Sequence, residues 1–205
     1  MQTLLNTPHE IIQQNILGAA AKAKTRILNI LVLGIMAGSF IAMGAQSSSL
    51  AVHNISNVGL ARTLAGCIFP VGLMMIVFVG GELFTGDCMM SMAWMQRKIH
   101  FADMLRTLVL VYVSNFVGAA LIAFLVAHSG QYDYSSGALG AYTIKVAYGK
   151  VHLSFANALV SGILCNILVC VAVLMAAAAK DIAGKVLAIF FPILAFVVSG
   201  FEHCV

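Results

Sequence analysis

Long apolar runs, separated by short polar stretches, dominate the pattern of this chain. A helix that spans a bilayer needs about 20 mostly apolar residues, so the runs predict five membrane spans. The first run is too long for the apolar segment of a cleaved signal, and we expect it to remain as a helix. We place the spans at residues 27–46, 64–80, 105–127, 155–179 and 186–200.

The second and fifth runs are interrupted in the same way. In the second, Phe69-Pro70 precedes a stop at residues 80–86, Gly-Gly-Glu-Leu-Phe-Thr-Gly. In the fifth, Phe191-Pro192 precedes a stop at residues 199–203, Ser-Gly-Phe-Glu-His. Interrupted segments at matching places in two halves indicate a transport site near the bilayer midplane. Broken helices are tolerated in a membrane only where protein or a water-filled cavity surrounds them.

An internal repeat accompanies these interruptions, because residues 29–36 resemble residues 157–164 and a Phe-Pro pair follows each segment. If the repeat unit has three spans, its second copy begins on the opposite side of the membrane and the repeat is inverted. We therefore expect an all-α membrane protein whose second and fifth helices are broken, with one channel domain over residues 1–205. The sixth span of such a repeat is missing here, and we expect the chain to be truncated before it.

The composition excludes an ordinary soluble domain, because 61% of the residues are hydrophobic and only 9% are charged, against about 25% charged in soluble domains. The placement of the basic residues predicts a multi-pass protein of the plasma (inner) membrane with a cytoplasmic N-terminus, and it argues against nucleic-acid binding. The predicted outer side carries Arg62, Lys145 and Lys150. The predicted cytoplasmic side carries Lys22, Lys24, Arg26, Arg97, Lys98, Arg106, Lys180 and Lys185.

Residues 1–25 predict an amphipathic helix that lies along the cytoplasmic surface. Thr7, Pro8 and Glu10 have the spacing of a helix start, with a hydroxyl cap, a first-turn proline and a glutamate at the third position. The apolar residues at helical spacing that we expect to share one face are Ile12, Ile16, Ala19, Ala20 and Ala23.

The chain lacks the motifs of several other classes. It contains no HExxH, G-x-S-x-G or P-loop sequence, which argues against a hydrolase or an ATP-driven pump. The five cysteines show no CxxC or Cys/His metal spacing, so we expect them to pack as small apolar residues and predict no metal or cofactor. Gly34 and Gly38 permit a close helix approach.

Thr85 and His203 are the candidates for binding chemistry. The backbone N–H groups of the first break, with a new helix expected from Asp87 onward, favour an anion, and Thr85 adds a hydroxyl. His203 lies at the second break, where an ionisable residue indicates function. Histidine is the side chain that ordinarily titrates near neutral pH. We expect Glu82 and Glu202 to hold the two loops by accepting backbone N–H groups.

Each of two further polar residues has two alternative roles. Lys150 either draws anions into a vestibule or is a solvated surface lysine. Asn166 either contacts a permeant or bonds to a neighbouring helix.

Residues 77–86 resemble the first signature of the formate/nitrite transporter family, and residues 162–172 resemble its second signature. Residues 199–204 resemble the break in the family's fifth helix, and residues 150–152 resemble its outer lysine segment. The resemblance implies an aquaporin-like fold of six spans, a homopentamer with one pore per protomer, and small monovalent anions (formate, nitrite or hydrosulfide) as permeants.

The resemblance also implies roles for individual residues. Thr85 and His203 would flank the centre of the pore, and Lys150 and Asn166 would attract or orient the anion. The expected apolar constrictions are Phe69, Leu73, Leu83 and Phe196, with Val169 and Phe84 in the same lining. The residues expected to support the loops and breaks are Gly81, Glu82, Gly86, Gly200 and Glu202.

The resulting hypothesis is passive anion conduction linked to protons through His203. The alternatives are an aquaporin-like channel for neutral small solutes, a non-transporting scaffold, and a membrane enzyme or assembly subunit that uses Glu202 and His203.

Overall fold

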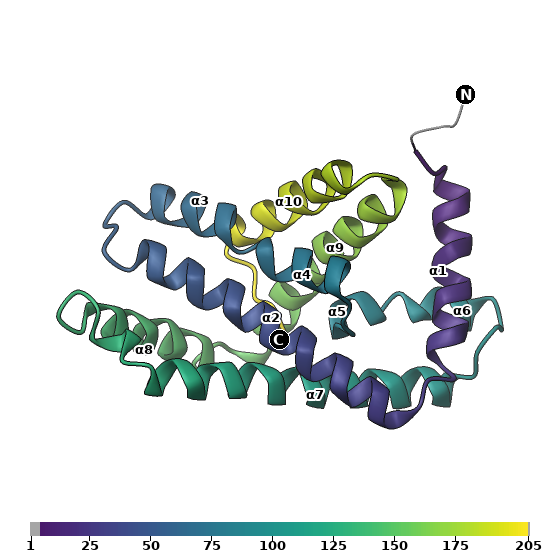
Figure 1. Ribbon diagram of the computed structural model, residues 1–205, viewed down its shortest axis with the longest axis horizontal. Coiled ribbons are helices and arrows are strands. Elements are labelled where there is room, and N and C mark those ends of the chain that lie inside the picture. Colours follow the sequence, from purple (N-terminus) through teal and green to yellow (C-terminus); the bar gives the residue numbers. More distant parts are fainter. Residues whose placement is uncertain (1–4, 205) are drawn as a thin grey trace.

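The computed structural model describes residues 5–204, which are helical apart from turns, short loops and one isolated bridge between Leu5 and Ala179. Figure 1 shows the long helices running side by side, with α1 lying across one end of the bundle. The α-helices are α1 (Pro8–Lys22), α2 (Ile27–Val52), α3 (Val58–Ile68), α4 (Val71–Val79), α5 (Phe84–Asp87), α6 (Met90–Met95), α7 (Phe101–His128), α8 (Ala138–Val151), α9 (Phe155–Ala178) and α10 (Ile182–Ser199), with a 3-10 turn η1 (Gln131–Asp133) before α8.

Five segments of the described chain are long and apolar enough to cross a membrane, as predicted: α2, α3 with α4, α7, α9 and α10. The second and fifth begin earlier than the apolar runs, because polar side chains cap them. The Asn57 side chain accepts the Leu60 N–H at 3.0 Å, and the Asp181 side chain accepts the Gly184 N–H at 2.7 Å. A cap of this kind starts a helix several residues before its hydrophobic part.

The helices α2 and α7 meet backbone to backbone (Figure 1). A Cβ built on Gly38 would lie 2.0 Å from the Asn115 carbonyl oxygen, and one on Gly118 would lie 2.0 Å from the Ile35 carbonyl oxygen. A Cβ on Gly34 would lie 1.9 Å from the Ser114 hydroxyl oxygen. The close approach predicted from Gly34 and Gly38 is therefore confirmed, and its partner is another helix of the same chain.

The two predicted prolines behave differently. Pro70 separates α3 from α4, whereas Pro192 lies inside α10, which continues through it. Proline lacks a backbone N–H and crowds the preceding turn, so it either ends a helix or bends it. The second span is thus interrupted twice, at Pro70 and at Gly80–Leu83, whereas the fifth has one helical piece that ends at Ser199.

The helix α1 has the predicted capping box, in which the Thr7 side chain accepts the Glu10 N–H at 3.3 Å and the Glu10 carboxylate accepts the Thr7 N–H at 2.7 Å. Its predicted apolar face is wrong at its first member, because Ile12 is 42% exposed and Ile11 is buried instead. The buried face packs on α6 and on the start of α7, in a cluster formed by Ile16, Ala19, Ala23, Met90, Ala93, Ile99 and Met104.

The region between α7 and α9, which lies between the third and fourth predicted spans, contains the helix α8. It begins after Gly137, which has a left-handed φ of +86°, and carries Lys145 and Lys150. Figure 1 shows α8 beside α7, at the end of the bundle opposite to α1.

Candidate functional site: two broken helices between two cavities

The first break is a four-residue gap in helical structure. The helix α4 ends at Val79, and Gly80 follows with φ +105°, which side-chain-bearing residues rarely adopt. The sequence predicts that helical structure resumes at Asp87, but it resumes at Phe84. The Asp87 N–H already reaches the Leu83 carbonyl at 2.9 Å. The resumed helix α5 is a single turn.

Asn115 of α7 holds this break in place and was missed by the sequence analysis. Its side-chain nitrogen donates to the carbonyls of Gly34 and Glu82, both at 2.8 Å. Its side-chain oxygen accepts the Phe84 N–H at 3.0 Å. The side chain is completely buried. An amide in the middle of an apolar span was the available signal, because polar residues inside the membrane usually bond to neighbouring elements.

Thr85 lies directly behind the break and is almost completely buried, at 1% exposure. Its hydroxyl makes no hydrogen bond to any described residue, and its carbonyl accepts the Cys170 thiol at 3.3 Å. Buried hydroxyl groups nearly always have a partner. The Thr85 hydroxyl is therefore a group that a small polar solute or water would satisfy.

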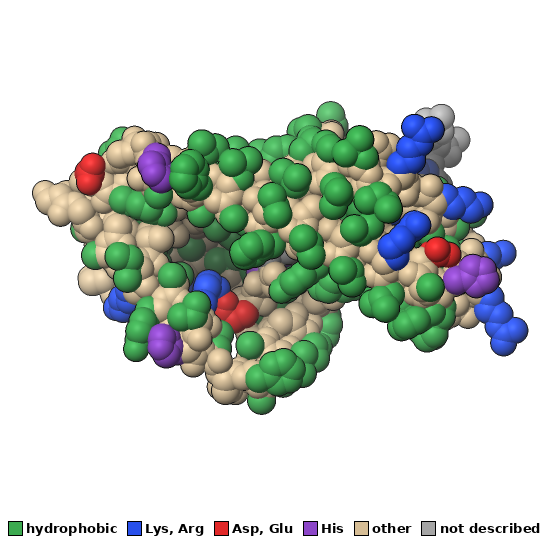
Figure 2. Space-filling view, turned by 90° about the horizontal axis from the view of Figure 1, so that it is seen from below, with side chains coloured by type: hydrophobic (Ala, Val, Ile, Leu, Met, Phe, Trp, Pro, Cys, Tyr) green, Lys and Arg blue, Asp and Glu red, His purple; other side chains and the backbone are tan. Residues whose placement is uncertain are grey.

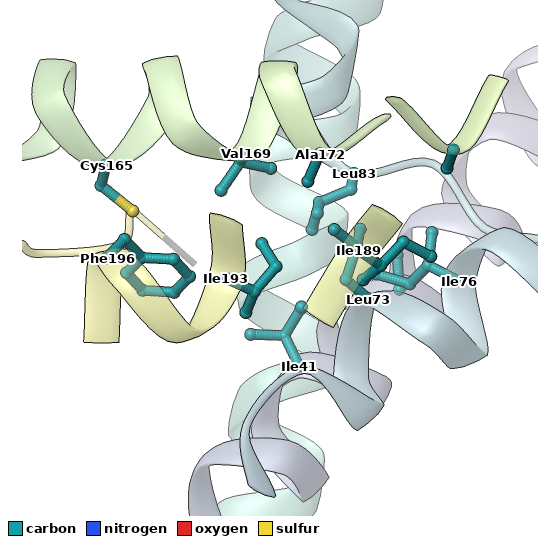
Figure 3. Close-up of a cluster of buried hydrophobic side chains, with 12 residues drawn as sticks. Ile41, Leu73, Ile76, Leu83, Cys165, Val169, Ala172, Ile189, Ile193 and Phe196 are labelled. Atoms are coloured by element: carbon teal, nitrogen blue, oxygen red, sulfur yellow. The ribbon is translucent and has the colours of Figure 1, made fainter. Parts of the chain in front are cut away.

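The apolar residues predicted as constrictions lie mostly together (Figure 3). Side chains of α9 and α10 point toward one another, and Leu83 from the first break meets them. The Phe69 ring packs on this cluster and makes an edge contact with Phe196, with 5.4 Å between ring centroids. The members are Ala37, Ile41, Leu73, Ile76, Leu83, Cys165, Val169, Ala172, Ala176, Ile189, Ile193 and Phe196.

Phe84 is the exception among these predicted residues. Its ring contacts Tyr112 of α7, with 5.2 Å between centroids, and it does not belong to the apolar cluster. The role of the other constriction residues in a pore stays a prediction.

The second break follows Ser199. Gly200 takes a left-handed φ of +71°, and the residues from Phe201 to Cys204 are not helical. The Glu202 N–H donates to the Ser161 hydroxyl at 2.8 Å, which attaches this segment to α9. The His203 ring lies 5.9 Å from the Phe196 ring, measured between centroids, at the edge of the apolar cluster.

The helix ends at the two breaks are less favourable to anions than the sequence analysis expected. The ends of α4 and α10 that meet the breaks are C-terminal and carry a partial negative charge. The new N-terminus belongs to the single turn α5, and Asn115 already takes its Phe84 N–H. Positive charge at the site must therefore come mainly from side chains.

A lysine pairs with the glutamate of each break, which corrects the expectation that both carboxylates mainly accept backbone N–H groups. Lys22 of α1 forms ion pairs with Glu82 and with Asp87, which is almost completely buried. Lys150 of α8 forms an ion pair with Glu202. Burial lowers the pKa of Lys22, but the carboxylates of Asp87 and Glu82 more than offset this, so its net pKa lies above the ordinary value.

Each ion pair borders a cavity. A cavity of about 300 Å³, here called the Lys22 cavity, is lined by Lys22, Gly86 and Asp87 together with residues of α1, α6 and α9. A larger one of about 840 Å³, here called the Lys150 cavity, lies at the α8 end, and the basic, acidic and histidine side chains that line it are Arg62, Lys145, Lys150, Glu202 and His203. In Figure 2 a hollow opens on the half of the molecule that carries α8, with a basic and an acidic side chain at its edge.

The remaining predicted residues have local contacts. Asn166 accepts the Cys170 thiol at 3.8 Å. Gly81 lies close to α2, since a Cβ there would be 3.2 Å from the Ala37 side chain, whereas one on Gly86 would meet nothing within 4 Å. Among residues 5–204 all cysteines are free, and no group of three His, Cys, Asp or Glu residues is placed to hold a metal ion.

Known proteins resemble the chain over almost its whole length. A family model described as formate/nitrite transporter matches residues 9–205. The chain is 37% identical to the formate channel BtFdhC of Bacillus thuringiensis, over 97% of this chain and 77% of that protein. It is 36% identical to the formate channel FocA of Haemophilus influenzae, over 91% of this chain and 66% of that one.

Two solved structures share the fold. A pentameric formate channel with formate bound matches with a TM-score of 0.77 and 31% identity, over 87% of this chain and 71% of that one. An FNT family ion channel matches with a TM-score of 0.83 and 27% identity, over 95% of this chain and 78% of that one. The predicted aquaporin-like helical fold is confirmed by these matches.

Proposed function

The chain belongs to the formate/nitrite transporter family, and on that premise we propose that it conducts small monovalent anions passively, with formate, nitrite and hydrosulfide as candidates. The family consists of transporters and channels, which favours transport over catalysis. Relatives named as formate channels make formate the first anion to test.

One arrangement carries the proposal: two cavities at opposite ends of the bundle, with the apolar cluster between them. Ile41 and Phe196 of the cluster line the Lys150 cavity. On the other side, two residues that line the Lys22 cavity are close in sequence to members of the cluster. Gly86 is three residues after Leu83, and Ala177 directly follows Ala176. A solute that follows this line would pass Lys22, Thr85, the apolar cluster, His203 and Lys150.

The apolar cluster makes protonation useful. Moving a bare anion from water into apolar surroundings costs many kcal/mol, whereas a neutral weak acid crosses at a much lower cost. The candidate anions are conjugate bases of weak acids, so a proton gained near the cluster would let them pass. His203 lies beside Phe196 and lines the Lys150 cavity, which supports it as the group that exchanges this proton.

The lysine–carboxylate pairs fit the same function. Lys150 would attract an anion to the larger cavity, while Glu202 prevents the lysine from holding it too tightly. At the other end two carboxylates, Glu82 and Asp87, face Lys22, so that end would bind an anion weakly and let it leave. Between the two ends, Asn166 and Thr85 would offer hydrogen bonds to the anion. The support for this role is strongest for Thr85, whose buried hydroxyl has no partner among the described residues.

Orientation and assembly are part of the proposal. Figure 2 shows basic side chains gathered at the α1 end of the molecule, which supports a cytoplasmic N-terminus in the plasma (inner) membrane. A homopentamer is supported by the similar structure that is titled a pentameric formate channel. The many exposed apolar side chains of α7 and α9 suit contact with lipid or with neighbouring protomers.

The test is flux into proteoliposomes, with formate, nitrite and hydrosulfide compared between pH 5 and 8. We expect anion flux that rises as pH falls, and His203→Asn should flatten this pH dependence. Unchanged pH dependence in the variant would remove His203 from the proton exchange. Glycerol or water flux equal to the anion flux would favour the neutral-solute channel instead, and absence of any flux would refute transport.

A further inference from the structure

We propose that Arg62 and Lys145 form an anion-capture subsite in the Lys150 cavity, separate from the Lys150–Glu202 pair. The inference rests on the proposed anion conduction and adds the residues that concentrate the anion before it reaches the apolar cluster. From the sequence these two side chains are predicted only to lie on the outer side, and nothing in the proposed conduction path uses them.

Arg62 of α3 sits at the C-terminal end of α10. Its guanidinium donates a long hydrogen bond, 3.4 Å, to the Val198 carbonyl. It also covers Gly200, because a Cβ built there would lie 2.9 Å from the Arg62 Nη1 atom. The guanidinium is therefore held at the second break, although the residue as a whole is exposed.

This position offsets an unfavourable field. The C-terminal end of a helix carries a partial negative charge, equivalent to about half an elementary charge, and the end of α10 lies at the wall of the Lys150 cavity. That charge would repel an approaching anion. Arg62 donates to one of the carbonyls that produce it, and so converts the end of α10 from a repelling surface to an attracting one.

Lys145 adds a second positive charge that no carboxylate offsets. It is exposed on α8, lines the same cavity, and makes no ion pair with any residue in the described range 5–204. The single acidic residue that lines the cavity, Glu202, is paired with Lys150. The field that remains for an incoming anion is therefore that of Arg62 and Lys145.

The two ends of the proposed path differ in this respect. In the Lys22 cavity one lysine faces two carboxylates, Glu82 and Asp87. In the Lys150 cavity three basic side chains face the single carboxylate of Glu202. A cavity lined by one sign of charge raises the local concentration of the opposite ion and the rate at which it enters, and salt suppresses the effect. Capture should thus be a property of the Lys150 end alone.

The experiment measures initial formate flux in proteoliposomes against formate concentration, at ionic strengths of about 20 mM and about 500 mM. We compare wild type with Arg62→Gln, Arg62→Lys, Lys145→Gln and the control Lys98→Gln, an exposed lysine at the α1 end. At low ionic strength each Gln variant at the subsite should raise the half-saturating concentration about fivefold. At high ionic strength the difference should shrink below about twofold, with the maximal flux unchanged.

The control variants should behave differently. Arg62→Lys should keep a half-saturating concentration close to that of wild type, and Lys98→Gln should match wild type.

Three results would overturn the inference. One is a loss of maximal flux in Arg62→Gln that is the same at both ionic strengths and is not rescued by Arg62→Lys, because Arg62 would then serve only as a cap for α10. Another is wild-type behaviour of Lys145→Gln, because the Lys145 side chain forms no ion pair with residues 5–204 whose loss could disturb folding. A third is an equal effect of Lys98→Gln. Wild-type protein that carries no anion would instead refute the proposed function itself, which separates the two failures.

Discussion

The side-chain oxygen of Asn115 accepts the Phe84 N–H at 3.0 Å, and this bond connects α7 to the residue where helical structure resumes after the first break. The same side chain donates to the Gly34 and Glu82 carbonyls, so one amide connects α2, the break and α7. Thr85 follows Phe84 directly, and the position of its hydroxyl therefore depends on Asn115.

Replacing Asn115 with Leu should destabilise the protein by about 1–3 kcal/mol, because a buried donor and buried acceptors lose their partner. Asn115→Asp should lose the two donated bonds and keep the accepted one, so it should be less stable than wild type as well. The thermal midpoint in detergent and the formate flux measure both effects. Ser114→Ala is the control, since within residues 5–204 the Ser114 hydroxyl bonds only to carbonyls of its own helix, and it should stay close to wild type.

Gly38→Ala should disrupt the contact between α2 and α7. The new methyl group would lie 2.0 Å from the Asn115 carbonyl oxygen, and backbone atoms cannot give way without separating the helices. We expect a loss of more than about 2 kcal/mol, seen as a lower thermal midpoint or a failure to assemble. Gly18→Ala in α1 meets nothing within 4 Å and should be neutral or slightly stabilising. Equal behaviour of the two variants would contradict this account of the contact.

Lys22→Met should leave Asp87 without its cationic partner. The Asp87 side chain is only 1% exposed, so its charge would be buried and unpaired. Removing one member of a buried pair costs about 3–5 kcal/mol, and partial exposure of Lys22 places this case near the lower value. Adding Asp87→Asn to Lys22→Met should restore part of the loss. Lys24→Met, at an exposed lysine on the same segment, is the matched control for the thermal midpoint.

The Lys22 pair also predicts a dependence of stability on pH. Burial alone would lower the pKa of Lys22, but Asp87 and Glu82 raise it above the ordinary value of 10.5 in the folded protein. The charged lysine's own contribution to stability is then fully present just below pH 10.5 and is lost as the pH rises through the folded pKa. Wild type should lose thermal stability in that alkaline range more steeply than Lys22→Met. Parallel curves for the two proteins would exclude a contribution from this lysine.

Gly200→Ala should cost more than Gly137→Ala, although both glycines are left-handed, with φ of +71° and +86°. Each alanine would bear about 1–2 kcal/mol of backbone strain. Only at Gly200 would the methyl group also displace the Arg62 guanidinium, since nothing lies within 4 Å of Gly137. The two thermal midpoints are compared first in wild type and then in an Arg62→Ala background. The part of their difference that disappears without the Arg62 side chain measures this contact. A difference that persists without the Arg62 side chain would show that another cause is at work.

The hydrophobic pattern was sufficient for the five spans and both breaks, because long apolar runs and Gly or Pro positions act locally. It was insufficient for the helix ends at Asn57 and Asp181, where a polar cap starts the helix outside the apolar run. The helix α8 was missed for a related reason: its sequence mixes glycine, tyrosine and lysine with apolar residues, and no single face is buried.

The site was harder to predict than the fold. Thr85 and His203 could be proposed from the breaks and the apolar residues from the family resemblance, but the partners of Glu82 and Glu202 could not be predicted. Lys22 is far from Glu82 in sequence, and an isolated lysine is usually solvated, so only the docking of α1 brings the two together. Asn115 was overlooked because one amide in a long apolar run has no sequence pattern that names its partners.

The glycines between α2 and α7 have a consequence for motion. Helices whose backbones touch cannot slide or rotate against each other without steric overlap, so this pair and the Asn115 bonds form a fixed wall. The helix α4 belongs to this wall as well, because a Cβ built on Gly72 would lie 3.0 Å from the Phe40 carbonyl oxygen of α2. Any widening between the two cavities must then come from α9 and α10, whose side chains in the apolar cluster can shift by rotamer changes. The molecule is thus divided into a stationary half and an adjustable half.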